Sequence, residues 1–176
     1  MIHDFYNHPS IVMWVPFNEG WGQFNTREIV ELTEKLDPTR LVNNASGWSD
    51  KNVGDVADRH EYPGPAMRET EDNRASVLGE FGGQALVVED HLWLSDFSKA
   101  PSHYETSQSK EKLHNKYDQL IRDLIPLKKK GLAAAVYTQT TDVETEVNGL
   151  MTYDRKVIKF DQEHMQEMHN RLIHGE

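Results

Sequence analysis

The chain has 176 residues, of which 37% are hydrophobic, and its 29 acidic and 19 basic side chains give a formal net charge of −10. This length is typical of one domain, and no apolar stretch approaches the roughly 18 residues of a membrane span. A negative net charge does not attract a phosphate backbone, so neither a nucleic acid nor a membrane is an expected partner. The absence of cysteine excludes disulfides and thiolate chemistry. No signal-peptide pattern is visible, and a chain without cysteine suits a reducing or an oxidising compartment, so both a cytoplasmic and an exported location stay open.

The first half of the chain alternates strand-like segments with one helix. An apolar run over residues 11–17 predicts a buried strand. Asn25 and Glu28 resemble a capping box, and helical spacing of apolar residues continues to Asp37 and Pro38, which end the predicted helix. Turn residues follow three further predicted strands, at residues 41–45, 56–60 and 75–81. The polar stretch 67–74 is predicted to be a surface connection.

The second half contains the longest predicted helix, over residues 109–130, with apolar side chains on one face. Pro126 is expected to kink its last turns, and Lys128 to Lys130 followed by Gly131 match a helix C-terminus. A fifth strand is predicted at residues 132–138 and a last helix at residues 160–173. Strands that alternate with helices indicate an α/β fold with a parallel sheet. Since no glycine-rich phosphate loop follows any strand, a barrel is favoured over a doubly wound sheet.

Two carboxylates occupy similar places at predicted strand ends. Glu19 follows the first apolar run, and Glu80 lies in the fourth, in the segment SVLGEFGG. A pair of carboxyl groups is what glycoside cleavage requires, because one protonates the departing oxygen while the other attacks the anomeric carbon. Either glutamate taken alone is more commonly a salt-bridge partner or a loop cap than a catalytic group.

Several strings along the chain resemble the catalytic barrel of family 2 glycoside hydrolases, the β-galactosidase-like enzymes. They are HPSIVMWVPFNEGWGQ, SGW with DVADRHEYPGP, SVLGEFGG and VYTQTTDVETEVNGLMTYDR. The resemblance implies one domain over residues 1–176, a (β/α)8 TIM barrel of which strands four to eight are present. It further implies a retaining β-glycosidase without cofactor, in which Glu19 is the acid/base, Glu80 is the nucleophile and Asn18 contacts the sugar 2-hydroxyl.

Further substrate contacts are expected from residues that follow other strands. His60 or Tyr62 can hold the place of a tyrosine that hydrogen-bonds the nucleophile in this clan; we expect His60 to contact a substrate hydroxyl and Tyr62 to form the site wall. Tyr137 stands where the clan often has a tryptophan beneath the sugar ring. Trp21 and Trp48 are candidates for stacking on sugar or for packing beneath a neighbouring loop. Asp142 and Glu144 are candidates for hydroxyl contacts or, more commonly, loop caps.

No metal site is expected, because the histidine pairs lie five residues apart, which does not place two ligands on one helix face. The expected partner is a β-linked oligosaccharide or other glycoside. Five strands cannot close a barrel, so we expect the chain to be a fragment that is inactive alone and needs the remaining domains of its polypeptide, or that self-associates. The alternatives are a carbohydrate-binding or scaffolding remnant without turnover, and an unrelated α/β enzyme with strand-end glutamates.

Overall fold

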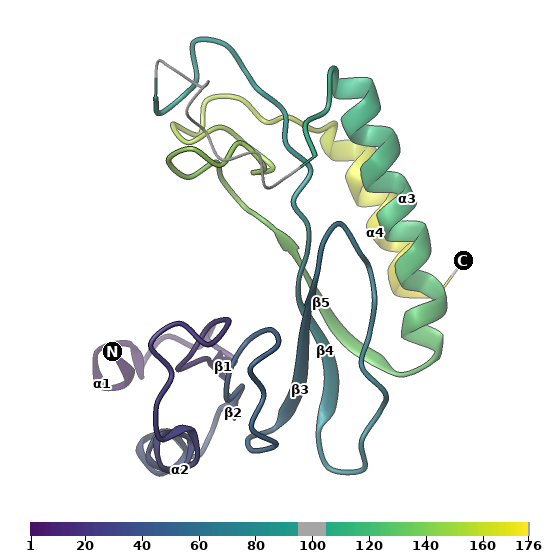
Figure 1. The fold of residues 1–176 in the computed structure, drawn as a ribbon. Coiled ribbons are helices and arrows are strands. Elements are labelled where there is room, and N and C mark those ends of the chain that lie inside the picture. Colours follow the sequence, from purple (N-terminus) through teal and green to yellow (C-terminus); the bar gives the residue numbers. More distant parts are fainter. Residues whose placement is uncertain (95–104, 176) are drawn as a thin grey trace. The chain divides into compact units, whose positions relative to one another are not determined.

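The described part of the chain, residues 1–94 and 105–175 of a computed structural model, contains both strands and helices (Figure 1). Five strands and three of the helices lie where the sequence predicts them, whereas the short α1 was not predicted. The elements are α1 (Ile2–Phe5), β1 (Met13–Trp14), α2 (Thr26–Leu36), β2 (Leu41–Val42), β3 (Val56–Glu61), β4 (Ala75–Gly82), α3 (Lys110–Lys129), β5 (Leu132–Thr138) and α4 (Gln162–His174).

The chain divides into two compact units. The first comprises residues 1–60, 67–79 and 131–135, and the second comprises residues 61–66, 80–130 and 136–176. Each of the three longer strands contributes residues to both units.

In the first unit, β1 and β2 pair in parallel, with Met13 opposite Leu41. Both strands are shorter than predicted. Pro16 has no N–H to donate to a ladder, so regular pairing ends early. The two chains nevertheless continue side by side, because Ser46 N donates to Phe17 O at 2.9 Å and Glu19 N donates to Ser46 O at 2.8 Å. This irregular extension carries Glu19 beyond the end of the strand.

The helix α2 follows the loop that contains Glu19. Asn25 precedes its first residue, as predicted, but the expected capping box is wrong. Asn25 adopts a left-handed conformation with φ 39°, and its side chain makes no hydrogen bond to the helix. Asparagine tolerates this conformation because its short side chain has a low steric cost there. Val30 and Thr33 are buried on the inner face of the helix.

Asp37 ends α2 and anchors the segments around it. Its Oδ2 accepts hydrogen bonds from Trp14 Nε1 at 2.9 Å and from Arg40 Nη1 at 2.5 Å. Arg40 also donates to the carbonyl oxygens of Tyr6 and Ile11, so the N-terminal segment is tied to the same point. Burial of Asp37 acts to raise its pKa, but hydrogen bonds from Thr39, Arg40 and Trp14 outweigh burial and hold the pKa well below the ordinary 3.8.

We expect Asp37→Asn to remove part of the acid sensitivity of folding. A depressed pKa means that the stabilisation by Asp37 is complete above the ordinary pKa and is lost as the pH falls through the lowered value in the folded protein. The variant should be less stable than the parent at neutral pH, and the difference should shrink below about pH 4. Urea denaturation midpoints measured from pH 7 downward test this, with the exposed Asp72→Asn as control. An unchanged gap between parent and variant at every pH would contradict it.

The three longer strands form a sheet in the order β3-β4-β5 (Figure 1). Hydrogen bonds show that these strands are parallel. At one end of β3 and β4, Ala75 N donates to Asp55 O at 3.0 Å, and just beyond the other end Gly82 N donates to Pro63 O at 2.8 Å. Gly83 N likewise donates to Thr138 O at 3.1 Å where β4 and β5 end. The carboxyl ends of the three strands therefore lie at one edge, where parallel sheets place functional residues.

The connection 67–74 differs from the surface segment that was predicted, because Arg74 is buried. Arg74 Nη1 donates to Asp50 Oδ1 at 2.8 Å, and Arg74 Nε donates to Glu71 Oε2 at 2.7 Å. Hydrogen bonds to Asp50 and Glu71 raise the pKa of Arg74. Burial acts to raise the pKa of Asp50, yet the hydrogen bonds from Arg74 and Asn44 lower it overall. A polar stretch in the sequence thus contains a structural anchor.

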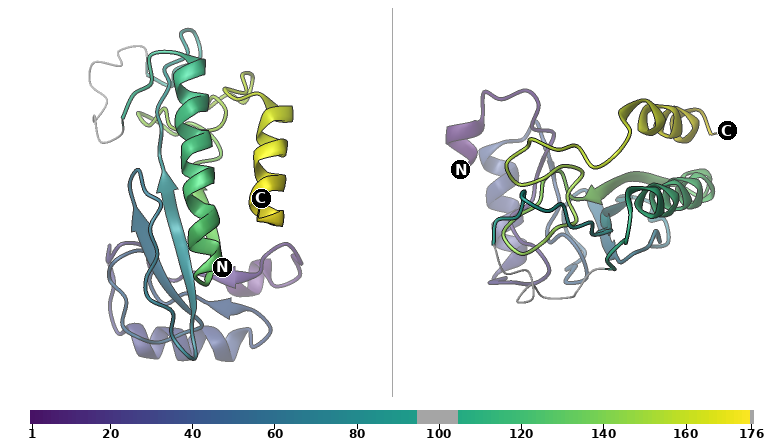
Figure 2. Two further views of the ribbon diagram at one scale, coloured as in Figure 1. Left: turned by 90° about the vertical axis from the view of Figure 1, so that its right-hand side faces the viewer. Right: turned by 90° about the horizontal axis from the view of Figure 1, so that it is seen from above.

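In the second unit, α3 and α4 lie side by side (Figure 2). Ser109 and Asp161 cap the N-termini of these helices through their side chains. The last member of the predicted apolar face of α3, Leu127, is only partly buried. The buried residues of α3 all belong to that face: Leu113, Tyr117, Leu120, Ile121 and Leu124. Lys128 lies in the last turn of α3, which confirms the predicted helix end. Its Nζ donates to the carbonyl oxygens of Leu172 and Ile173 in α4. Pro126 lies inside α3.

The fold class is α/β with parallel sheets, as predicted. The described strands form one two-stranded and one three-stranded sheet and do not close into a barrel. Within the described residues, every helix is too short or too polar to cross a membrane.

Candidate active site

Glu19 lies in the turn that follows β1. Its backbone adopts a left-handed conformation with φ 52°, and Gly20 and Gly22 also have positive φ values. A non-glycine residue in this region carries strain, which often marks a functional position. Gly20 is required by its surroundings, since a Cβ there would lie 2.5 Å from Ser49 Oγ. The turn leaves the Glu19 side chain 20% exposed.

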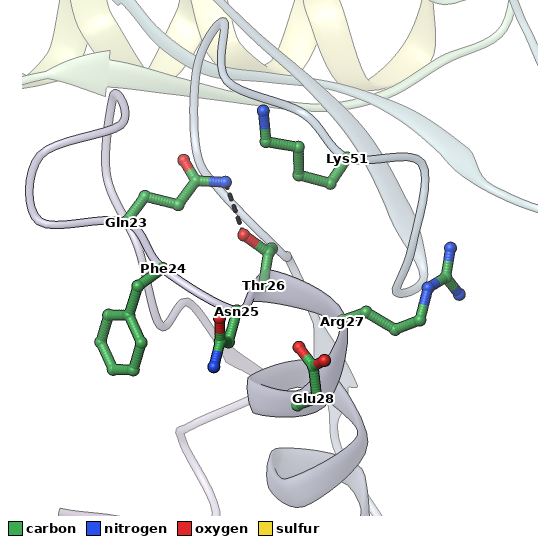
Figure 3. Close-up of a pocket in the computed structure, with 7 residues that line it drawn as sticks. All are labelled: Gln23, Phe24, Asn25, Thr26, Arg27, Glu28 and Lys51. Carbon is green, nitrogen blue, oxygen red and sulfur yellow. Dashed lines mark hydrogen bonds between the residues drawn. The ribbon is translucent and has the colours of Figure 1, made fainter.

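Gln23 holds the remainder of this loop. Its Nε2 donates to Thr26 Oγ1 at 2.9 Å and to Ser49 O at 3.0 Å, so it joins the Glu19 loop to the start of α2 and to the loop after β2 (Figure 3). A cavity of about 450 Å³ lies beside it, lined by Gln23, Phe24, Asn25, Thr26, Arg27, Glu28 and Lys51. Neither Glu19 nor Glu80 lines this cavity.

A chain of buried hydrogen bonds supports Glu19 in the first unit. His60 Nδ1 lies 2.9 Å from Glu19 Oε1, and His60 Nε2 lies 2.6 Å from Ser46 Oγ. Ser46 Oγ donates in turn to Asp58 Oδ2 at 2.7 Å. The His60 side chain has no exposed surface. Gly47, with φ +99°, allows this ring to lie against the turn, because a Cβ there would be 3.1 Å from His60 Nδ1.

Asp58 ends this chain of hydrogen bonds and is fully buried. Asn43 Nδ2 also donates to its Oδ2, at 2.6 Å. The backbone N–H groups of Gly79 and Arg59 donate to Oδ1, at 2.7 Å and 2.6 Å. The carboxylate of Asp58 occupies the place that a Cβ at residue 79 would need, which explains a glycine immediately before Glu80.

Glu80 is placed by β4 in the second unit. The hydroxyl group of Tyr62, just beyond β3, donates a hydrogen bond to Glu80 Oε2. Tyr62 Oη also lies 2.9 Å from Thr138 Oγ1, the last residue of β5. The Glu80 carboxylate is therefore held at the carboxyl ends of the strands by a tyrosine, the contact that was considered for either His60 or Tyr62.

The other expected substrate contacts differ in their exposure. In the first unit, Trp48 is 66% exposed and its ring lies edge-on to His60 at 5.9 Å, while Trp21 is 80% exposed. Both indole rings are available for stacking. Asn18 is also exposed. In the second unit, Tyr137 packs edge-on against Phe81 and Tyr117, with ring centroids 5.6 Å and 5.0 Å apart.

Tyr137 is partly buried, and its hydroxyl accepts a hydrogen bond from Gln84 N at 3.3 Å. Burial raises the pKa of this phenol. The ring fills the space beside Gly82, where a Cβ would overlap it. These contacts fix the orientation of Tyr137 at the end of β5.

Asp142, in the loop after β5, has a structural role. Lys159 Nζ donates to Asp142 Oδ1 at 2.6 Å, and Gly149 N donates to the same oxygen at 2.8 Å. Both side chains of the ion pair are almost entirely buried. Burial raises the pKa of Asp142 and lowers that of Lys159. Asp142 thus serves as a loop cap, while Glu144 is exposed.

The sequence interpretation did not single out Ser46, Asp58 or Thr138 for the site. The sequence did offer a signal for Ser46 and Thr138, because each is a polar residue at or just after the end of a predicted strand. Asp58 lies inside β3, where alternation alone does not distinguish a buried acid from one that faces solvent.

Comparison with known protein families gives one match that covers almost the whole chain. Residues 1–171 match the family model described as "Glycosyl hydrolases family 2, TIM barrel domain". A search of curated proteins gives no match. The matched residues include both glutamates and the hydrogen-bond partners of Glu19 and Glu80 described above.

Proposed function

Because the chain belongs to glycosyl hydrolase family 2 through its TIM barrel domain, we propose that it carries the catalytic machinery of a retaining, β-galactosidase-like glycosidase. In this proposal Glu80 is the nucleophile and Glu19 is the acid/base. The observation that carries it is that each glutamate lies at a strand end and has its own hydrogen-bond partner, Tyr62 for Glu80 and His60 for Glu19. Different partners suit the different tasks of two chemically identical side chains.

The first step forms a glycosyl-enzyme ester. Glu80 attacks the anomeric carbon as a carboxylate, and the Tyr62 hydroxyl, which donates to Oε2, keeps one of its oxygens in place. The bond to the leaving oxygen breaks as that oxygen takes the proton of Glu19. The carboxylate of Glu80 thereby becomes an ester, and Glu19 becomes a carboxylate.

The second step releases the sugar. The Glu19 carboxylate removes a proton from water, and the water oxygen attacks the anomeric carbon while the ester bond to Glu80 breaks. Two inversions at the same carbon give net retention of configuration. Both glutamates return to their starting protonation states, so no cofactor is required by this sequence of steps.

The remaining substrate contacts follow from exposure and position. We assign sugar stacking to Trp48, which is exposed beside His60, and hydrogen bonding to the sugar 2-hydroxyl to Asn18, which directly precedes Glu19. Tyr137 contributes to the base of the sugar site at the end of β5, and Tyr62 contributes to its wall. The His60 side chain has no exposed surface, so we assign it to supporting Glu19 rather than to contacting a substrate hydroxyl.

We also propose that β1 to β5 correspond to strands four to eight of an eight-stranded barrel. Support comes from the acid/base motif, which follows β1, and from apolar side chains exposed on both β1 and β5 and beside them. Val12 is 70% exposed and Val136 is 54% exposed. Since a closed barrel requires more strands, we propose that activity depends on further segments or on self-association, and the experiments below use the natural polypeptide.

Covalent trapping tests the proposed function. Dinitrophenyl 2-deoxy-2-fluoro-β-D-galactoside has a leaving group that needs little protonation, and its fluorine slows release of the ester. We expect inactivation, a mass increase equal to one fluorosugar, and a label on the peptide that contains Glu80. The corresponding glucoside is the comparison for sugar preference. Saturable binding without a covalent label would favour the carbohydrate-binding alternative instead.

A further inference from the structure

A chain of hydrogen bonds behind Glu19 constrains where its protons lie. The chain runs from Asp58 through Ser46 and His60 to Glu19, entirely within the first unit. This inference rests on the proposed role of Glu19 as acid/base and concerns how that role is supported. At the buried end, at Asp58, the hydrogen-bond directions are unambiguous.

Asp58 accepts all of its hydrogen bonds. Its partners include the amide of Asn43, the hydroxyl of Ser46 and the backbone N–H groups of Arg59 and Gly79. The three N–H partners can only donate, and an ionised carboxylate can only accept. The single hydroxyl proton of Ser46 is therefore directed at Asp58.

Ser46 consequently presents only lone pairs to His60. Because Ser46 Oγ lies 2.6 Å from His60 Nε2, the proton between these atoms belongs to the imidazole. In neutral histidine, one ring nitrogen donates and the other accepts. With Nε2 protonated, Nδ1 presents its lone pair to Glu19 Oε1, 2.9 Å away.

A hydrogen bond between Nδ1 and Glu19 then requires one further proton. The proton lies either on Glu19, as a carboxylic acid that donates to neutral His60, or on His60, as an imidazolium that donates to the carboxylate. The pair holds one proton in both arrangements. Since the His60 side chain has no exposed surface, water does not replace either partner at the ring.

We propose that Asp58, acting through Ser46, fixes the tautomer of His60 so that His60 and Glu19 share the single proton used for general acid catalysis. His60, Ser46 and Asp58 are thus positioning residues. When the leaving oxygen takes the proton, the bond between carbon and that oxygen breaks, and a lone pair of Nδ1 faces a carboxylate with no proton between them. This arrangement favours uptake of a proton from the attacking water in the second step, which restores the pair.

Asp58→Asn tests the proposal because it preserves shape and reverses the direction of the chain. The Oδ1 atom can still accept from Gly79 and Arg59, while the new amide nitrogen must donate to Ser46. Asn43 Oδ1 is buried and makes no hydrogen bond, so a flip of the Asn43 amide provides an acceptor for the other new proton. Ser46 then donates to His60 Nε2, and Nδ1 becomes a donor that no longer requires a proton from Glu19.

We expect Asp58→Asn to lower kcat/KM for phenyl β-D-galactoside, a substrate with a poor leaving group, by about 100-fold or more. The loss on dinitrophenyl β-D-galactoside, whose leaving group needs little protonation, should stay within about 5-fold. Ser46→Ala, which removes the hydroxyl between Asp58 and His60, should show the same selectivity with a smaller loss. Asp118→Asn, which alters an aspartate paired with His164 in α3 and α4, is the matched control and should leave both substrates unaffected.

Equal losses on both substrates would show that Asp58 only maintains the fold, and unchanged activity on both would overturn the proposal. If Asp58→Asn does not fold, Ser46→Ala decides alone by the same criterion. Labelling by the fluorinated galactoside distinguishes a failure of the proposed function from a failure of the proposed hydrogen-bond chain. Absence of labelling in the parent protein contradicts the proposed function, whereas normal labelling in all variants together with an unchanged leaving-group preference contradicts only the role of the hydrogen-bond chain.

Discussion

Replacing Glu80 by glutamine is expected to lower kcat by at least about 10⁴-fold, equivalent to about 5.4 kcal/mol in the activation free energy. The amide has the shape of the carboxylate but is not a nucleophile, so no glycosyl ester can form. The hydrogen bond from Tyr62 can persist, because the amide oxygen still accepts it. Steady-state hydrolysis of dinitrophenyl β-D-galactoside by the natural polypeptide provides the measurement.

Added azide supplies a second readout for Glu80→Gln. A small anion can attack the anomeric carbon in place of the missing carboxylate, and a single displacement gives a glycosyl azide of inverted configuration. The matched control is Glu89→Gln, at an exposed glutamate outside the proposed site. Residual activity of Glu80→Gln within about tenfold of the parent, a barrier change below about 1.4 kcal/mol, would reject the nucleophile role.

Replacing Glu19 by alanine is expected to affect substrates according to their leaving groups. Phenyl β-D-galactoside needs a proton on its departing oxygen, so its kcat/KM should fall by about 10³-fold, within the usual range for loss of a general acid. Formation of the glycosyl ester from the dinitrophenyl substrate should be nearly unaffected. Release of that ester should become slow, because Glu19 is also the proposed base that activates water.

Azide again distinguishes the two steps. In Glu19→Ala it should accelerate release of the glycosyl-enzyme and give a glycosyl azide of retained configuration, since two displacements occur at the same carbon. Glu28→Ala, at an exposed glutamate in the first turn of α2, is the control. If kcat/KM falls equally for the phenyl and the dinitrophenyl substrate in Glu19→Ala, the acid/base assignment fails.

The sequence predicted where the strands and main helices lie because apolar periodicity and turn residues are local signals. The runs at β3, β4 and β5 have the predicted positions nearly to the residue. The first two strands are shorter than predicted because regular pairing depends on a neighbour and on available N–H donors, and Pro16 supplies none. The capping box predicted at Asn25 is absent, since Asn25 has a left-handed backbone and its side chain makes no hydrogen bond to the helix.

The hydrogen-bond partners of the two glutamates could not be predicted from the sequence. His60 and Tyr62 are two residues apart, and sequence alone did not decide which of them contacts the nucleophile. The structure pairs Tyr62 with Glu80 and His60 with Glu19. The support from Asp58 and Ser46 depends on contacts between β3 and the loop after β2, and the buried Arg74 likewise depends on Asp50, which is distant in sequence. Such pairings have no local signature.

The close fit between Gly79 and Asp58 limits how this protein can be engineered. Gly79 directly precedes Glu80 in the chain, while Asp58 lies at the start of the hydrogen bonds that reach Glu19. Any side chain introduced at residue 79 would displace the Asp58 carboxylate and would also alter the backbone that carries Glu80. A mutagenesis library directed at this strand to change Glu80 would therefore also perturb the support of Glu19, so variation at residue 79 cannot tune the two glutamates separately.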